Sequence, residues 1–223
     1  MSIKRKLIGF FYPQRCPFCN TIVRAEDIAC DSCMQRIRQV QRPILRGAAG
    51  VRCVSSFLYD GKVRRLLIRV KFHNRTQHIC QVAAILKKDI DACYAKVPFD
   101  LITYVPMHIK DQKHRGYNQS ELLAKELGKL MNLPVADTLV KVKRTKKQHS
   151  LTYSERRTNL RGAFQTAAGA VLKDKTVLLV DDIITSGSTL GYCAKELSKA
   201  RPAMICCATI ANADALADKS AVI

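Results

Sequence analysis

Two adjacent carboxylates followed by small and hydroxylated residues mark the stretch VLLVDDIITSGSTL, residues 177–190. Asp181 and Asp182 offer acceptor oxygens that suit the vicinal hydroxyls of a ribose, or a magnesium ion that bridges ribose and diphosphate. The following turn favours an anion, because Gly187 permits a positive φ and the amides at a helix N-terminus attract phosphate. The residues expected to cradle that phosphate are Thr185, Ser186, Gly187, Ser188 and Thr189. The stretch therefore predicts a binding site for a sugar phosphate.

The apolar run 177–180 must position these acids. It is short and rich in β-branched residues, which predicts a strand buried on both faces of a parallel sheet. Ligands of open α/β sheets bind at the carboxyl ends of strands, where the next helix points its N-terminus inward. An ordinary buried strand followed by a capped helix is the alternative, but it leaves two neighbouring acids at a strand end unexplained. Walker and dinucleotide-binding loops are excluded, because neither G-x-x-x-x-G-K-[ST] nor G-x-G-x-x-G occurs in residues 177–190.

Four cysteines in the segment CPFCNTIVRAEDIACDSC predict a structural zinc site, and they are Cys16, Cys19, Cys30 and Cys33. Two C-x2-C pairs separated by ten residues can complete a closed thiolate tetrahedron that leaves no position for water. A redox pair is the alternative, but it needs a thioredoxin-like βαβ context that this segment lacks. So short a segment has no core of its own, and zinc binding is expected to supply most of its folding free energy. The remaining cysteines stand in apolar contexts and are expected in the core: Cys53, Cys80, Cys93, Cys193, Cys206 and Cys207.

Alternating strand and helix patterns predict a doubly wound parallel α/β fold flanked by helices, with a small N-terminal zinc-finger or ribbon module. Strands are expected at 51–61, 100–106, 177–182 and 203–210, and helices at 62–73, 79–90, from Asn118 onward and at 189–200. Residues 107–119 are expected to form a loop, and Asn118 with Glu121 predicts a capping box. The expected domains are a zinc-binding module with linker at 1–48 and an α/β domain at 49–223.

The charge distribution favours polyanionic partners. The chain carries 38 Lys and Arg against 18 Asp and Glu, a formal net charge of +20. Residues 62–75 hold six basic and no acidic residues, and 141–161 hold eight basic and one acidic. Such a surface binds DNA or RNA with steep salt dependence and little sequence preference, although a solvated basic surface is the alternative. Aromatic residues beside or within the zinc module are candidates for stacking on unpaired bases, with core burial as the alternative: Phe10, Phe11, Tyr12 and Phe18.

A cytoplasmic location is expected from the apolar segments. No run approaches the roughly 20 apolar residues of a transmembrane helix. The N-terminal residues lack the long apolar region and the cleavage site of a signal peptide.

Taken together, residues 104–135, 144–164 and 177–190, preceded by the cysteine quartet, resemble the ComF family, which is similar to the GntX group. Particularly close are R-G-Y-N-Q at 115–119, T-x-x-Q-x-x-L at 145–151 and R-x-x-N at 156–159. The resemblance implies a type I phosphoribosyltransferase domain. It also implies a role in natural transformation, where imported single-stranded DNA is handled on the cytoplasmic side, often beside a helicase-like partner.

Residues 177–190 resemble the phosphoribosyl diphosphate loop of type I phosphoribosyltransferases. The resemblance implies that Asp181 and Asp182 hold the ribose hydroxyls, with magnesium, and that residues 185–189 cradle the 5′-phosphate. Thr185 stands where purine-salvage members carry a third acid, which argues against a salvage enzyme. A mobile loop of such enzymes closes over the diphosphate, and its cations stabilise the departing charge. In the tract 141–161 the candidates for that catalytic role are Lys146, Lys147, His149 and Arg156. Arg115 is a further catalytic candidate, because the loop after Val105 begins at the carboxyl end of a strand and could bring Lys110, Lys113, His114 and Arg115 to the same diphosphate, with a solvated basic loop as the alternative.

Two functions follow from these patterns. The first is a phosphoribosyltransferase-domain protein that binds phosphoribosyl diphosphate and magnesium and acts in DNA uptake, with an acceptor that the sequence does not specify. The second is a single-stranded nucleic-acid-binding adaptor in which the pocket is a sensor or a relic without turnover.

Overall fold

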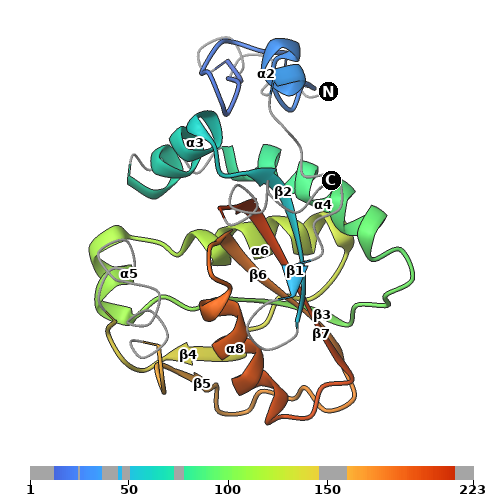
Figure 1. Ribbon diagram of the computed structural model, residues 1–223, viewed down its shortest axis with the longest axis vertical. Coiled ribbons are helices and arrows are strands. Elements are labelled where there is room, and N and C mark those ends of the chain that lie inside the picture. The colour runs from blue at the N-terminus through green and yellow to red at the C-terminus, as the bar shows by residue number, and fades with distance from the viewer. Residues whose placement is uncertain are drawn as a thin grey trace, which may run out of the picture.

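A five-stranded sheet forms the centre of the molecule (Figure 1). The computed structural model describes residues 13–24, 26–36, 45–46, 51–72, 78–145 and 160–213. The strand order is β1-β2-β7-β6-β3, and only β1 is antiparallel to its neighbour. The strands are β1 Leu45–Arg46, β2 Arg52–Leu58, β3 Leu101–Tyr104, β6 Thr176–Ile184 and β7 Met204–Asn212. The predicted parallel α/β fold is confirmed.

Helices cover both faces of this sheet. The helices are α3 Gly61–Phe72, α4 His78–Cys93, α6 Gln119–Met131 and α8 Ser188–Ser198. Successive strand residues point to opposite faces, so Leu178 of β6 joins a core with α4 and α6, whereas Leu179 joins a second core with α8. Within the described residues, no helix has the length and apolarity that a membrane span requires.

One of the six cysteines expected in the core lies outside it. Cys80 is exposed, whereas Cys93 is half-buried and packs against the core, and the other four are buried. Cys80 belongs to α4, where residues on the outward face of the helix remain near solvent. The apolar sequence context alone did not distinguish the two faces.

A small antiparallel sheet lies beside α8. It pairs β4 Leu139–Lys141 with β5 Phe164–Thr166. The Thr166 hydroxyl donates to the Glu196 carbonyl at 3.0 Å and so attaches the sheet to the helix. The tract between β4 and β5 contains residues 146–159, which lie outside the described residues.

Residues 109–115 form a short helix, α5 Ile109–Arg115, where a loop was expected. The His108 side chain caps it by accepting from the Lys110 amide, and Gly116 ends it with a left-handed φ of 89°. Asp111 lies in the first turn and Lys113, His114 and Arg115 in the last, which suits the helix dipole. These helix signals are visible in the sequence, but they span too few residues to show a buried stripe.

The zinc module packs on the α/β domain and shares its core (Figure 1). It contains the short helix α2 Asp31–Arg36. The ring of Phe18 is 1% exposed and meets the ring of Phe57 edge to face, with centroids 5.4 Å apart. From α4, the Gln81 side-chain amide donates to the carbonyls of Ile28 at 2.8 Å and Arg15 at 3.3 Å. Phe18 is therefore a core residue and cannot stack on a base, while Phe10, Phe11 and Tyr12 lie outside the described residues.

Candidate functional site

Strand β6 continues through both acids and ends two residues later than expected. Asp181 pairs with Thr209 of β7, and the pairing persists to Ile184 and Asn212. The buried apolar residues 177–180 pack on both faces and lead the strand to the acids. Asp181 is 8% exposed, whereas Asp182 is half-buried.

The two carboxylates have different surroundings. Asp181 Oδ1 accepts hydrogen bonds from the Ser120 hydroxyl at 2.8 Å and from the Asp182 amide at 2.9 Å. The Asp182 carboxylate makes no hydrogen bond or ion pair with any residue that the structure describes. Asp182 therefore has carboxylate oxygens available for a cation or a hydroxyl group.

The turn after β6 has the geometry of an anion site. Gly187 is the N-cap of α8 with φ 71° and ψ −3°, and it makes no side-chain capping hydrogen bond. A residue with a Cβ is strained at that φ, which explains the glycine. The hydroxyl oxygens of Ser186 and Ser188 lie 2.9 Å apart. The first-turn amides and these hydroxyls provide donors for an anion such as phosphate.

Residues 115–120 attach the start of α6 to the end of β3. The Asn118 side chain donates to the Val105 carbonyl at 3.0 Å and accepts from the Ser120 amide at 3.0 Å. The N-cap prediction for Asn118 is thus confirmed, but Glu121 interacts with Gln112 and Lys125. Arg115 Nη1 donates to Gln119 Oε1 at 2.9 Å, so the end of α5 is joined to the start of α6.

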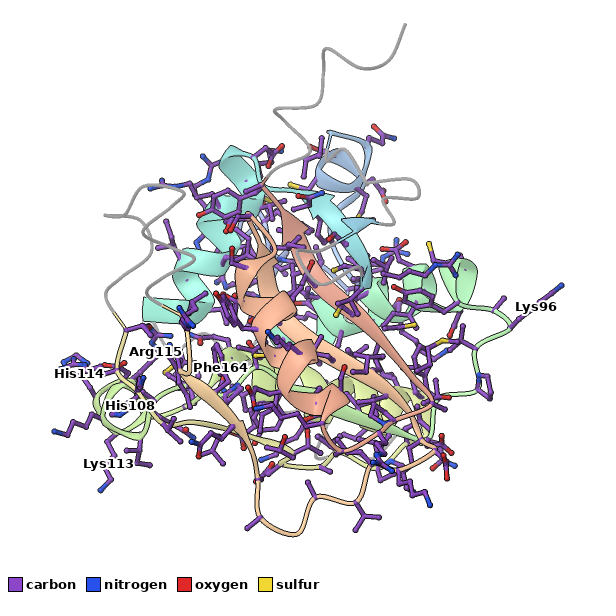
Figure 2. All side chains as sticks on the ribbon, turned by 60° about the horizontal axis from the view of Figure 1, so that its bottom comes forward. Lys96, His108, Lys113, His114, Arg115 and Phe164 are labelled. Carbon is purple, nitrogen blue, oxygen red and sulfur yellow. The ribbon has the colours of Figure 1, made fainter. Side chains whose placement is uncertain are left out.

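Of the predicted catalytic cations, only Arg115 lies within the described residues. Lys113 and His114 point away from the body of the molecule (Figure 2). Lys141 belongs to the basic tract 141–161 but was not among the predicted site residues. Its Nζ lies 5.6 Å from the centroid of the Phe164 ring, and burial lowers the pKa of the ammonium group. The predicted residues outside the described part of the chain are Lys146, Lys147, His149 and Arg156.

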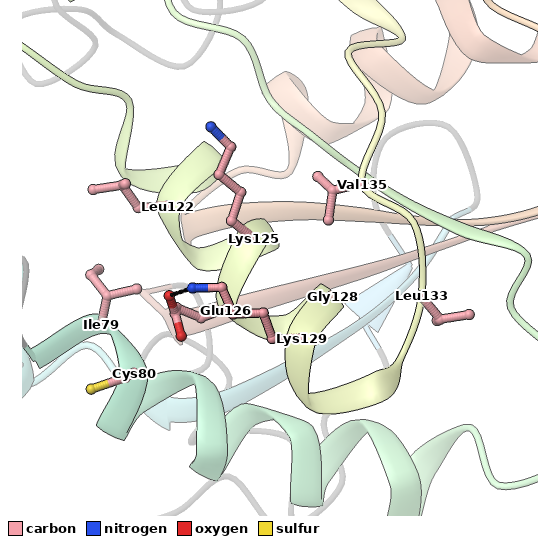
Figure 3. A pocket seen from close by; sticks show the side chains of 9 residues that line it. All are labelled: Ile79, Cys80, Leu122, Lys125, Glu126, Gly128, Lys129, Leu133 and Val135. Carbon is pink, nitrogen blue, oxygen red and sulfur yellow. Dashed lines mark hydrogen bonds and ion pairs between the residues drawn. The ribbon is translucent and has the colours of Figure 1, made fainter.

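Apart from these residues, a groove of about 750 Å³ lies between α4 and α6 (Figure 3). Its lining includes Leu122, Leu133 and Val135, and its Lys129 is paired with Glu126. A Cβ on Gly128 would come within 2.5 Å of Val135 Cγ2, so glycine permits the close approach of the chain beside the groove. None of its lining residues carries the paired acids or the phosphate turn.

The four cysteines of the quartet converge. Their Sγ atoms all lie within 4.8 Å of one another, and those of Cys19 and Cys30 are 3.6 Å apart. Four sulfurs at about 2.3 Å from one zinc ion would stand about 3.8 Å apart, so the cluster fits this metal. Each pair lies on a tight turn. The Asn20 amide donates a hydrogen bond to the Cys16 carbonyl at 2.9 Å, and the Cys33 amide donates one to the Cys30 carbonyl at 2.9 Å.

The electrostatics of the quartet also suit a cation. Burial raises the pKa of Cys33, and hydrogen bonds with the neighbouring thiols raise it further, to about 12. For Cys19, burial acts in the same direction, but hydrogen bonds from Thr21 and the other cysteines outweigh it and lower the pKa to about 6. Lys62 Nζ lies 3.5 Å from the Cys33 sulfur, where its charge would partly balance the excess negative charge of four thiolates around one zinc ion. A zinc ion would replace the protons that these thiols share.

Comparison with known proteins supports both parts of this description. The sequence profile of the phosphoribosyl transferase domain matches residues 115–222, and that of the double zinc ribbon domain matches residues 7–45. Competence protein F of Haemophilus influenzae is 35% identical over 140 residues, which cover 60% of this chain and 61% of that protein. The chain is thus similar to ComF-family proteins and carries a phosphoribosyl transferase domain. The predicted resemblance is confirmed, and the cysteine quartet is a structural zinc centre.

Further relatives match this chain over more of its length. The DNA utilization protein YhgH of Salmonella typhimurium is 26% identical over 186 residues, which cover 82% of this chain and 77% of that protein. A solved adenine phosphoribosyltransferase is similar with a TM-score of 0.44 and 12% identity, covering 68% of this chain and 79% of the other.

Proposed function

We propose that this ComF-like chain binds phosphoribosyl diphosphate with magnesium where β6 meets α8, and acts in DNA uptake or processing. The observation that carries the proposal is the carboxylate of Asp182, which pairs with no residue in the described part of the chain, close in sequence to the N-terminus of α8 at Gly187. The names of the relatives, competence protein F and DNA utilization protein, support the biological role.

The described residues suggest how each part of the ligand is held. The amides at the start of α8 and the hydroxyls of Ser186 and Ser188 donate to the 5′-phosphate. Asp181 and Asp182 hold the ribose hydroxyls. Magnesium is commonly bound by one or two carboxylates together with substrate phosphates, and the available oxygens of Asp182 fit that ligand set.

The reaction that fits this site is transfer of the ribosyl phosphate to a nucleophile with release of diphosphate. Positive charge near the departing diphosphate stabilises the transition state. Arg115, held by Gln119 at the start of α6, is our candidate for that role among the described residues. Lys146, Lys147, His149 and Arg156 remain predicted contributors from the tract between β4 and β5.

Isothermal calorimetry with phosphoribosyl diphosphate and magnesium tests the proposal. We expect one saturable site per chain, and weaker binding when magnesium is omitted. Ribose 5-phosphate and diphosphate, titrated separately, show which half of the ligand contributes most of the affinity. The exposed Asp91, which pairs with Lys87 on α4, provides a matched control as Asp91→Asn. Absence of binding by zinc-loaded, folded protein would contradict the proposal.

A second candidate function is binding of single-stranded nucleic acid by α3 and the neighbouring zinc module. Helix α3 contains no acidic residue, and Arg64 and Arg65 are exposed on it. Arg69 Nη1 on this helix donates a hydrogen bond to the Phe18 carbonyl at 3.5 Å, so the basic helix lies in contact with the zinc module. A nucleic-acid strand that binds there would contact cations from both.

We expect the affinity for single-stranded DNA without a recognition sequence, such as oligothymidine, to fall steeply as the salt concentration rises from about 50 to 300 mM. Replacing both Arg64 and Arg65 by alanine should reduce the slope of log K against log salt by about 1.4, since each lost phosphate contact removes about 0.7. Fluorescence anisotropy measures the affinity. The double variant Lys96→Ala and Lys173→Ala removes the same charge elsewhere, and Lys96 projects from a distant loop (Figure 2). An affinity independent of salt would exclude this function.

A further inference from the structure

Ser120 lies in the first turn of α6 and reaches across to the tip of β6. Its hydroxyl donates to Asp181 Oδ1 at 2.8 Å, although 61 residues separate the two in sequence. Both side chains are buried, with 5% exposure for Ser120 and 8% for Asp181. A buried carboxylate needs hydrogen-bond donors to remain ionised, and bonds to charged groups are the stronger ones. Ser120 supplies one such donor, and the Asp182 amide supplies another.

The position of Ser120 is itself fixed by the backbone around it. Asn118 accepts from the Ser120 amide and donates to the Val105 carbonyl, just beyond the end of β3. Strand β3 is paired with β6, with Tyr104 opposite Val180. The Val105 amide also donates to the Val180 carbonyl at 2.9 Å, so hydrogen bonds connect Asp181, Ser120, Asn118 and both strands. The hydroxyl of Ser120 is therefore held at a defined place relative to the acids.

We propose that Ser120 is a positioning residue of the sugar-phosphate site. It orients the carboxylate of Asp181 before the ligand arrives, so that the two adjacent acids meet the ribose hydroxyls without rearrangement. Ser120 does not touch the ligand; it acts through Asp181. This inference rests on the proposed binding of phosphoribosyl diphosphate, and it adds a residue from the first turn of α6 to the site.

A purely structural link between α6 and β6 is the competing explanation. Loss of such a link would lower the thermal stability and weaken every ligand of the site alike. Loss of a positioning bond has a selective effect, because Asp181 faces the ribose while the phosphate binds the start of α8. Affinity for phosphoribosyl diphosphate should then fall, while affinity for inorganic phosphate should not.

The test compares Ser120→Ala, Ser120→Thr and Ser120→Val by calorimetry with phosphoribosyl diphosphate plus magnesium and with inorganic phosphate. Threonine and valine have the same shape, so their difference isolates the hydroxyl even if alanine fails to fold. We expect alanine and valine to weaken phosphoribosyl diphosphate binding by about 10- to 100-fold, the range of one hydrogen bond to a charged group. Threonine should restore most of the affinity, and phosphate binding should stay within about twofold in all folded variants.

Ser198→Ala provides the matched control, because the Ser198 hydroxyl also donates one bond, to the Ala194 carbonyl at the far end of α8. It should leave both affinities unchanged. Equal binding of phosphoribosyl diphosphate by Ser120→Val and Ser120→Thr would overturn the inference, as would a parallel loss of both ligands. If the wild-type protein binds phosphate but not phosphoribosyl diphosphate, the proposed function fails and this inference fails with it.

Discussion

Removal of zinc lowers the thermal unfolding midpoint of the whole protein by about 10 °C or more. Cys16, Phe18 and Cys33 belong to the same hydrophobic core as Phe57 and Leu66, and the Phe18 ring contacts the ring of Phe57 on β2. Without the metal the module loses most of its folding free energy, and the apolar surface of β2 and α3 becomes exposed. Loss of one buried aromatic contact costs about 3 to 5 kcal/mol. In a protein of this size each kcal/mol shifts the midpoint by about 2 to 4 °C.

Circular dichroism with increasing chelator, combined with elemental analysis of bound zinc, measures this effect. Cys16→Ser should reproduce it, because it removes one ligand of the quartet. The exposed Cys80, outside the quartet, provides the matched control as Cys80→Ser. An unchanged thermal unfolding midpoint after complete removal of zinc would show that the stability of the α/β domain does not depend on the zinc module.

Asp182→Asn is expected to weaken binding of phosphoribosyl diphosphate with magnesium by about 100-fold or more. The substitution keeps the shape of the side chain but removes the charge that the cation requires. Two lost interactions with charged groups, at about 1.5 to 3 kcal/mol each, account for an effect of at least this size. The stability of the fold should hardly change, because no described residue pairs with the Asp182 carboxylate.

The companion variant Asp181→Asn separates binding from stability. Asp181 Oδ1 accepts two hydrogen bonds in a buried position, so its replacement should lower both the affinity and the unfolding midpoint. Titration calorimetry and thermal unfolding of both variants, beside Asp91→Asn, make the comparison. Retention of full affinity by Asp182→Asn would refute the assignment of Asp182 to the ligand.

Features written in consecutive residues were predictable from the sequence. Residues 177–190 carry the strand, the acids and the turn in one run, and the C-x2-C spacing of the quartet needs no knowledge of the fold. Helix α5 was missed although its caps are visible, because seven residues give too little periodicity. The sequence did not single out Ser120 and did not decide between stacking and burial for Phe18, because their partners, Asp181 and Phe57, are distant in sequence. Those contacts become visible only in the structure, where α6 and the zinc module pack against the sheet.

The hydrogen bonds from Gln81 to the zinc module have a consequence for biosynthesis. The side-chain amide of Gln81 contacts the carbonyls of Arg15 and Ile28, which precede it by 66 and 53 residues. At a translation speed of about 5 to 20 residues per second, the zinc module leaves the ribosome roughly 3 to 13 s before Gln81 does. Metal binding during that interval would let the nascent zinc module fold locally before the surface on which it packs has been synthesised.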